Sequence, residues 1–243
     1  MSEFIIALQY HAGDRDQAIA LAELMAANEP KFCEDVILLI VQRFDAELFP
    51  LDVVERLAKK FSVWSFTTTT KAEGWPDGCN AMARDTLREI RRRWATREWG
   101  EAEGALLLEP DCIPIQKDWI HQIRAEWELA RMVERSCWLM GTWRDGGGVL
   151  GHINGNMVVR MDFEALVDLG NLPYGLAWDC AISPQVHDHW IITGLICNRW
   201  LERNLSDEDI RTHRTPSIQQ KPVLVHGCKD DSVMNYARKI LLA

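Results

Sequence analysis

The chain has 243 residues, of which 47% are hydrophobic and 26% charged, with a formal net charge of −9 at pH 7. This length and composition suit one large α/β domain with an ample core, and we take residues 1–243 as a single domain. The acidic balance excludes a global attraction to nucleic acid or anionic membranes, and no apolar stretch reaches the ~18 residues of a membrane span. The seven cysteines include no C-x-x-C pair, which indicates reduced thiols in a cytoplasmic protein rather than a disulfide framework or a zinc site.

Strands and helices alternate in the first 135 residues. Among the residues expected to face the core are Val54 and Ala58 in the second helix and Trp94 in the third. This alternation predicts a three-layer α/β/α sandwich with a mostly parallel central sheet. Apolar runs predict its strands at 4–8, 36–41, 63–67 and 104–108, each followed by a helix with apolar residues at helical spacing.

From residue 136 the alternation becomes irregular, and we take residues 136–243 as a second half of the same domain. A loop is expected over 144–148 and another over 151–156, because both stretches are rich in glycine and polar residues. A short helix is expected over 163–169. Short strands are predicted at 137–140, 157–159 and 223–227, and a last helix at 233–240.

The strand at 104–108 ends in the sequence Glu109-Pro110-Asp111. Its apolar residues show no polar alternation, so it should be buried on both faces, and Pro110 bars its continuation. Residues two apart in a strand point to the same side, so two carboxylates should share one small volume at the strand's carboxyl end. Open α/β sheets bind ligands at that edge, and Mg²⁺ or Mn²⁺ would balance such a pair of acids. A solvated turn is the alternative.

Several motifs in one order resemble the GT-A glycosyltransferases that use nucleotide sugars, most closely those of family 2. The glutamate at position 109 departs from the usual acid-x-acid motif, so metal contact through Asp111 alone, or through water, stays open. The resemblance implies a GT-A-like fold in which residues 1–135 bind the nucleotide sugar and residues 136–243 bind the acceptor. The motifs are the alternating first half, the acids at 109–111, the Gly151–Asn156 run, Trp178-Asp179, and His226-Gly227 before the last helix.

The resemblance implies transfer of a sugar from a nucleoside diphosphate, UDP being the one we expect, to an acceptor hydroxyl. Glu109, Asp111 and His226 would hold Mn²⁺ or Mg²⁺ against the leaving diphosphate, and the imidazole favours Mn²⁺. Asp179 is the candidate general base, with a helix cap as the alternative. The residues implied in donor binding are Gln9, Tyr10, Asn80, Arg84, His152, Asn154, Asn156 and Lys229.

One basic and aromatic cluster, the Arg88–Arg97 patch, lies on the third predicted helix. It is either a solvated helix face or a track for DNA, as in phage-type enzymes that glycosylate hydroxymethylated bases flipped out of the duplex. A cell-envelope or small-molecule glycosyltransferase fits the sequence equally well. A nucleotidyltransferase and a non-catalytic nucleotide-sugar-binding protein are the remaining alternatives, and the oligomeric state is open.

Overall fold

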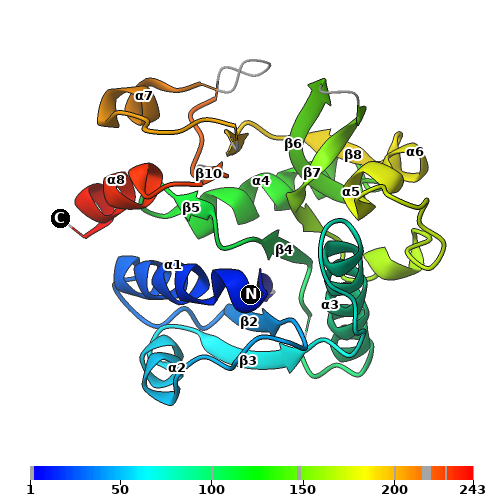
Figure 1. Ribbon diagram of the computed structural model, residues 1–243, viewed down its shortest axis with the longest axis horizontal. Coiled ribbons are helices and arrows are strands. Elements are labelled where there is room, and N and C mark those ends of the chain that lie inside the picture. The colour runs from blue at the N-terminus through cyan, green and yellow to red at the C-terminus, as the bar shows by residue number, and fades with distance from the viewer. Residues whose placement is uncertain are drawn as a thin grey trace.

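The computed structural model describes residues 3–99, 101–146, 149–199, 201–214, 220–227 and 229–242, with the backbone alone at 145, 146, 149 and 150 (Figure 1). Within these residues, a seven-stranded main sheet has the order β3-β2-β1-β4-β7-β6-β8, and a small sheet has the order β5-β10-β9. The strands are β1 Phe4–Tyr10, β2 Val36–Gln42, β3 Ser62–Thr67, β4 Gly104–Leu108, β5 Cys112–Pro114, β6 Leu139–Gly146, β7 Val149–Val159, β8 Trp190–Ile192, β9 Ile196–Asn198 and β10 Leu224–His226.

The main sheet is parallel except for one strand. Strand β1 pairs in parallel with β2 and β4, β2 with β3, and β6 with β8, whereas β7 is antiparallel to both β4 and β6. Leu106 pairs with Val158, so the chain two residues earlier in β7 passes the carboxyl end of β4. The predicted mostly parallel central sheet is confirmed.

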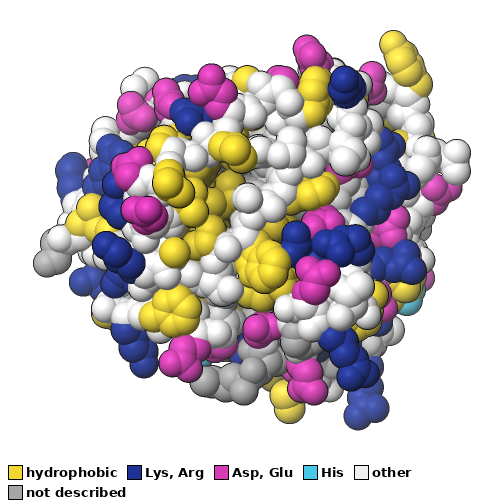
Figure 2. Space-filling view, turned by 90° about the horizontal axis from the view of Figure 1, so that it is seen from below, with side chains coloured by type: hydrophobic (Ala, Val, Ile, Leu, Met, Phe, Trp, Pro, Cys, Tyr) yellow, Lys and Arg dark blue, Asp and Glu magenta, His cyan; other side chains and the backbone are white. Residues whose placement is uncertain are grey.

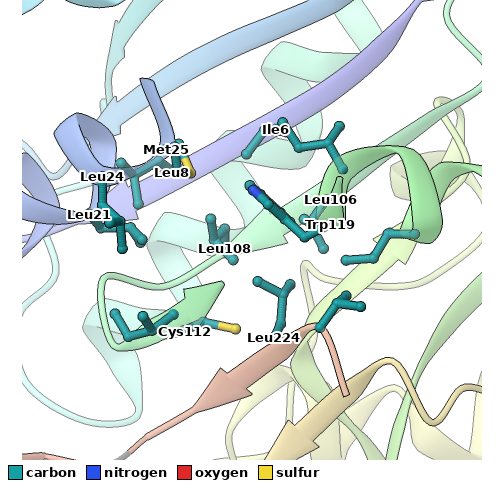
Figure 3. Packing of buried hydrophobic residues seen from close by; sticks show 14 of the residues in the cluster. Ile6, Leu8, Leu21, Leu24, Met25, Leu106, Leu108, Cys112, Trp119 and Leu224 are labelled. Atoms are coloured by element: carbon teal, nitrogen blue, oxygen red, sulfur yellow. The ribbon is translucent and has the colours of Figure 1, made fainter. Parts of the chain in front are cut away.

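Helices cover both faces of the main sheet, which gives the predicted three layers. Ile6 and Leu8 of β1 pack with α1, α4 and the small sheet, as Figure 3 shows, whereas Ile5 and Ala7 face α3 and α5. No described helix is both long and apolar enough to cross a membrane. The helices are α1 Arg15–Asn28, α2 Leu51–Ala58, α3 Asp77–Ala95, α4 Trp119–Val133, α5 Trp178–Ala181, α6 Ser183–Val186, α7 Asp207–Thr212 and α8 Ser232–Leu241.

The polar stretches of the second half are strands where loops were expected. Residues 151–156 lie within β7, and β6 extends to Gly146, so the loop expected over 144–148 is wrong at its start. The polar residues of 151–156 bond to other side chains of the protein, and this is why a loop-like composition forms a strand. The helix expected over 163–169 is only a 3₁₀ turn, Phe163–Ala165.

Three side chains expected in the core are not fully buried. Ala58 is exposed and Val54 is half-buried, because α2 has only the narrow inner stripe of Val53 and Leu57 against the sheet. Trp94 is 37% exposed, since it lies in the last turn of α3.

The small sheet carries the C-terminal part of the chain back to the acids after β4. Strand β4 of the main sheet ends before Pro110, and β5 begins directly after Asp111. Strand β10 pairs antiparallel with β5, which sets His226 opposite Cys112. The Gly227 amide donates to the Asp111 carbonyl at 2.9 Å. The acids therefore lie at the junction of the two sheets.

Gly104 at the start of β4 is expected to tolerate no side chain. A Cβ there would lie 2.4 Å from Nε1 of Trp127, a fully buried residue of α4. Because the indole cannot move without repacking α4, Gly104→Ala should lower the free energy of unfolding by about 1–3 kcal/mol. Urea unfolding measures the change. Gly175→Ala is an informative contrast, since a Cβ there meets no atom within 4 Å and only its φ of +73° is strained. A smaller loss in Gly104→Ala than in Gly175→Ala would contradict the expected clash.

Candidate functional site

Two carboxylates and one imidazole meet where the main sheet joins the small sheet. His226 Nε2 lies 2.9 Å from Glu109 Oε2 and 3.4 Å from Asp111 Oδ1. Asp111 and His226 are buried, whereas 43% of the Glu109 side chain is exposed. The structure thus brings together the three residues expected to bind metal, in a cluster that opens to solvent on its Glu109 side.

Positive charge holds this cluster together. The ammonium of Lys229, a half-exposed side chain, forms an ion pair with Asp111 Oδ2. Burial alone would raise the pKa of Asp111, but the hydrogen bond and charge of His226, with the Lys229 ammonium, hold it far below its ordinary value. Burial likewise opposes charge on His226, yet its bonds to Asp111 and Glu109 raise its pKa to about 9. At pH 7 the cluster therefore contains an imidazolium and an ammonium against two carboxylates.

Strand β7 supplies the neutral part of the site. The Glu109 amide donates to Asn156 Oδ1 at 2.8 Å, and Asn156 Nδ2 donates to Glu109 Oε2 at 3.0 Å. Asn156 also donates from its backbone N and its side chain to Asn154 Oδ1, both at 3.2 Å. Both asparagines are buried. Asn156 fixes the direction of the Glu109 side chain, and Asn154 in turn holds Asn156.

Asp179 lies at the first turn of α5 against the same strand. Its Oδ2 accepts from the Gly155 amide at 3.0 Å, and its Oδ1 accepts from the Cys180 amide at 2.9 Å. His152 Nε2 lies 3.7 Å from Oδ2. Burial raises the pKa of Asp179 despite the opposing charge of His152. A carboxylate of this kind is poised to accept a proton closer to neutrality than an exposed aspartate.

Asn80 ties α3 to the segment that carries Asp179. Its Oδ1 accepts from the Trp178 amide at 2.7 Å, and its Nδ2 donates to the Leu176 carbonyl at 3.0 Å. Both ends of the Asn80 amide are therefore engaged within the protein. Asn80 therefore joins α3 to the start of α5, and its expected contact with the donor stays a prediction.

Gln9, Tyr10 and Arg84 are also expected to bind the donor, and their surroundings differ. Gln9 is buried, and its Nε2 has no hydrogen-bond partner among the described residues, which suits a ligand contact. Tyr10 is fully buried against Phe49, and its hydroxyl donates to the Glu47 carbonyl at 2.8 Å. Alternation along β1 sets the Tyr10 side chain on the core face with Leu8, and its expected contact with the donor stays a prediction. Arg84 is half-buried on α3, 3.5 Å from the Thr70 hydroxyl.

Sequence reasoning missed other side chains around the cluster. Burial raises the pKa of Asp14, and the negative charge of Asp111 adds to the rise. Burial likewise raises the pKa of Cys79, with a further contribution from Glu109. The positive charge of Arg43 lowers the pKa of Cys79. Arg43 follows β2 and is ion-paired with Asp45 at 2.6 Å. Asp14 and Arg43 follow the carboxyl ends of β1 and β2, so the strand-end rule applied to all parallel strands would have found them.

Four arginines of the Arg88–Arg97 patch are ion-paired with acids. Arg91 pairs with Glu164 at 2.7 Å, and Arg88 lies 3.3 Å from the same carboxylate. Arg92 and Arg93 both pair with Glu89, at 2.8 and 2.6 Å. On the face seen in Figure 2, Lys and Arg side chains are interspersed with Asp and Glu, without a continuous basic surface. The described part of the patch is thus a salt-bridged helix face.

The donor set of the acid cluster fits a divalent cation. Two carboxylates and an imidazole, with ligand atoms within 4.8 Å of one another, are ligands that Mn²⁺ accepts and that Mg²⁺ accepts in part. At pH 7 the ring of His226 is protonated, so its Nε2 proton must leave before a cation binds there. His226 Nδ1 is buried without a partner among the described residues, so this ring is oriented by its contacts at Nε2.

Comparison with solved structures identifies the fold. The galactosyltransferase LgtC, in complex with donor and acceptor sugar analogues, superposes with a TM-score of 0.56 over 97% of this chain and 96% of that chain, at 8% identity. A glycosyltransferase involved in glycosylating the major capsid of PBCV-1 has a TM-score of 0.52 over 99% and 100%, at 12% identity. S. aureus TarS (residues 1–349) in complex with UDP-GlcNAc has a TM-score of 0.50 over 96% and 60%, at 10% identity.

These likenesses show that the chain has the fold of the GT-A glycosyltransferases, as the sequence motifs predicted. No protein-family model and no curated protein matches the sequence. The fold sets the acid cluster at the carboxyl end of β4, beside β7, whose Gly155 amide donates to Asp179.

Proposed function

We propose that the protein is a metal-dependent glycosyltransferase that moves a sugar from a nucleoside-diphosphate sugar to an acceptor hydroxyl. The observation that carries the proposal is the Glu109–Asp111–His226 cluster at the carboxyl end of β4 in a GT-A fold. Glu109 reaches His226 in spite of its extra methylene, which favours a working cluster over a non-catalytic relative. In this proposal residues 1–135 bind the donor and residues 136–243 bind the acceptor.

The charged residues of the site would bind the diphosphate end of the donor. Glu109, Asp111 and His226 would hold Mn²⁺ or Mg²⁺, which supplies Lewis-acid neutralisation of the leaving diphosphate. Lys229 is half-exposed beside Asp111 and would bind a phosphate oxygen through its ammonium. Asn156 keeps the Glu109 carboxylate aimed at the cluster through two hydrogen bonds.

Asp179 would accept the proton of the acceptor hydroxyl in an inverting transfer. The amides of Gly155 and Cys180 fix its carboxylate, and Asn80 fixes the start of its helix. The hydroxyl oxygen attacks the anomeric carbon as its proton passes to Asp179, and the bond from that carbon to the diphosphate oxygen breaks. His152, whose Nε2 lies 3.7 Å from this carboxylate, and Asn154 are both buried and offer hydrogen bonds suited to sugar hydroxyls.

UDP is the nucleotide we propose, because TarS, which shares the fold, has been solved with UDP-GlcNAc. Gln9, near the end of β1, is the candidate contact to the nucleoside, since its Nε2 has no partner among the residues that the structure describes. A nucleotidyltransferase is disfavoured, since the turn after β1 presents Asp14 and Asp16 rather than a basic, glycine-rich cradle for triphosphate.

The acceptor remains an alcohol of unassigned class. A hydroxymethylated DNA base was one acceptor expected from the sequence. That expectation depended on binding of DNA phosphates by the positive charges of the Arg88–Arg97 patch. Arginines of that patch form salt bridges with Glu89 and Glu164. We therefore favour a cell-envelope or small-molecule acceptor over DNA.

Stabilisation by donor nucleotide tests the proposal. Unfolding should be followed with UDP, GDP, ADP and CDP, each with and without Mn²⁺. We expect UDP with Mn²⁺ to stabilise most, by about 2.7 kcal/mol at a concentration of 100 Kd. Stabilisation that is equal for all four nucleotides, or independent of the cation, would contradict a specific metal-dependent donor site.

Cation binding should strengthen as pH rises. His226 has a pKa of about 9, so at pH 7 the ring carries a proton that must leave before Nε2 can bind a cation. One displaced proton makes the Mn²⁺ association constant rise about tenfold per pH unit below that pKa. Calorimetric titration between pH 6.5 and 8 in buffers of different ionisation enthalpy would measure the slope and the proton release. A pH-independent constant would show that His226 is not a ligand.

A further inference from the structure

A second three-ligand cluster lies beside the acid cluster and has a different chemistry. His152, Asp179 and Cys180 each offer one ligand atom, and these atoms all lie within 4.8 Å of one another. His152 and Cys180 are buried, and Cys180 is a free thiol. The two clusters contact adjacent residues of β7: Asn156 bonds to Glu109, and Gly155 bonds to Asp179.

The ligand set selects a soft cation. A tetrahedral zinc ion has bonds of about 2.0 Å to nitrogen and oxygen and about 2.3 Å to sulfur, so its ligand atoms lie about 3.3–3.5 Å apart. His152 Nε2 and Asp179 Oδ2 are 3.7 Å apart, within a small adjustment of that spacing. Thiolate and imidazole favour Zn²⁺ or Co²⁺ over Mg²⁺ and Mn²⁺, whereas the acid cluster has no sulfur.

The carboxylate in this cluster is already oriented by groups outside the ligand set. The amides of Gly155 and Cys180 each donate to one oxygen of Asp179, at 3.0 and 2.9 Å. Fixed ligands of this kind reduce the ordering cost of binding a cation. Three protein ligands leave the fourth position of a zinc ion open for water.

We propose that His152, Asp179 and Cys180 form a second cation site that takes Zn²⁺ and thereby inhibits the enzyme. Binding exchanges the thiol proton for the metal, so one Zn–S bond forms as the proton passes to solvent. Zinc at this site occupies the carboxylate assigned as general base, so it blocks proton transfer without displacing Mn²⁺ from the acid cluster. The inhibition rests on the proposed function, whereas the binding site does not. This proposal departs, for Cys180, from the expectation from the sequence of reduced thiols without a zinc site.

Cobalt absorption tests the site without any enzyme assay. Co²⁺ bound to Cys180 should give a near-ultraviolet sulfur-to-cobalt charge-transfer band together with tetrahedral visible bands, and Zn²⁺ should remove both. Cys180→Ser should abolish the charge-transfer band. Cys137→Ser should retain it, because Cys137 is equally buried but bonds to the Leu139 carbonyl. Absence of the band in the wild type, or its survival in Cys180→Ser, overturns the proposal. Loss of the band in Cys112→Ser alone would assign the sulfur to the acid cluster and also overturn it.

Turnover tests the inhibition separately. With saturating Mn²⁺ and donor, Zn²⁺ should lower wild-type transfer at least tenfold at concentrations where Cys180→Ser keeps its own zinc-free rate. Equal inhibition of both proteins would show that zinc acts at the acid cluster and would overturn the inhibitory role. If the wild type transfers no sugar at all, the proposed function fails, while the cobalt spectra still decide the site.

Discussion

Asp111→Asn is expected to abolish sugar transfer and the Mn²⁺-dependent part of donor binding. Asp111 is buried between His226 and Lys229, and its pKa is held far below the ordinary value, so it carries a full negative charge at any working pH. The amide keeps the shape but removes that charge, which leaves an imidazolium and an ammonium facing one carboxylate. We expect kcat/KM to fall by at least about 10²-fold, as for loss of a group that orients or holds a metal.

Loss of folding must be separated from loss of chemistry in this variant. The charge removed is a partner of two cations, so Asp111→Asn should also lose about 1–3 kcal/mol of stability. Activity is therefore compared at a temperature where circular dichroism shows both proteins folded. Asp188→Asn is the matched control, because that side chain is 89% exposed on the loop after α6. If Asp111→Asn retains normal turnover, or if UDP with Mn²⁺ stabilises it as much as the wild type, the cation does not bind at this cluster.

The main sheet could be predicted because its central strands are uninterrupted apolar runs. The segments at 36–41 and 104–108 have no polar alternation, and the structure buries both on two faces. Helices between them imply parallel pairing, since short loops cannot join parallel strands. The same reasoning did not predict the antiparallel strand β7, because its sequence is rich in Gly and Asn. The side chain of Asn156 bonds to Glu109 and the backbone amide of Gly155 bonds to Asp179, and hydrophobic periodicity does not reveal such bonds.

The candidate site was predictable only where local rules apply. Glu109 and Asp111 follow from the strand that precedes them, whereas the position of His226 depends on the pairing of β10 with β5, distant in sequence. Tyr10 was expected near the donor from its place at the end of β1, yet its side chain is on the core face with Leu8. In the sequence, nothing except its position next to Asp179 indicated that Cys180 belongs to a site. Side-chain direction at a strand end, and contacts between distant segments, are properties of the folded chain.

Asp179→Asn should separate chemistry from binding. The carboxylate is not part of the acid cluster, so donor and Mn²⁺ affinity should stay within about threefold of the wild type. Asparagine retains an oxygen for the Gly155 amide but cannot accept the acceptor's proton. General-base catalysis contributes about 10²–10⁴-fold, and we expect kcat to fall by that range with little change in the KM for donor. Asp188→Asn, an exposed carboxylate (89%) on the loop after α6, is the control.

The pH dependence of kcat gives a second readout for the same residue. Burial raises the pKa of Asp179, and a base must be deprotonated to act, so wild-type kcat should fall as pH drops through that raised pKa. The residual activity of Asp179→Asn should lack this acidic limb, because the titrating group is gone. His226 does not produce the limb when the cation is bound, since its ring is then held deprotonated at Nε2. An acidic limb that persists unchanged in Asp179→Asn, or a kcat near that of the wild type, would assign proton transfer to another group.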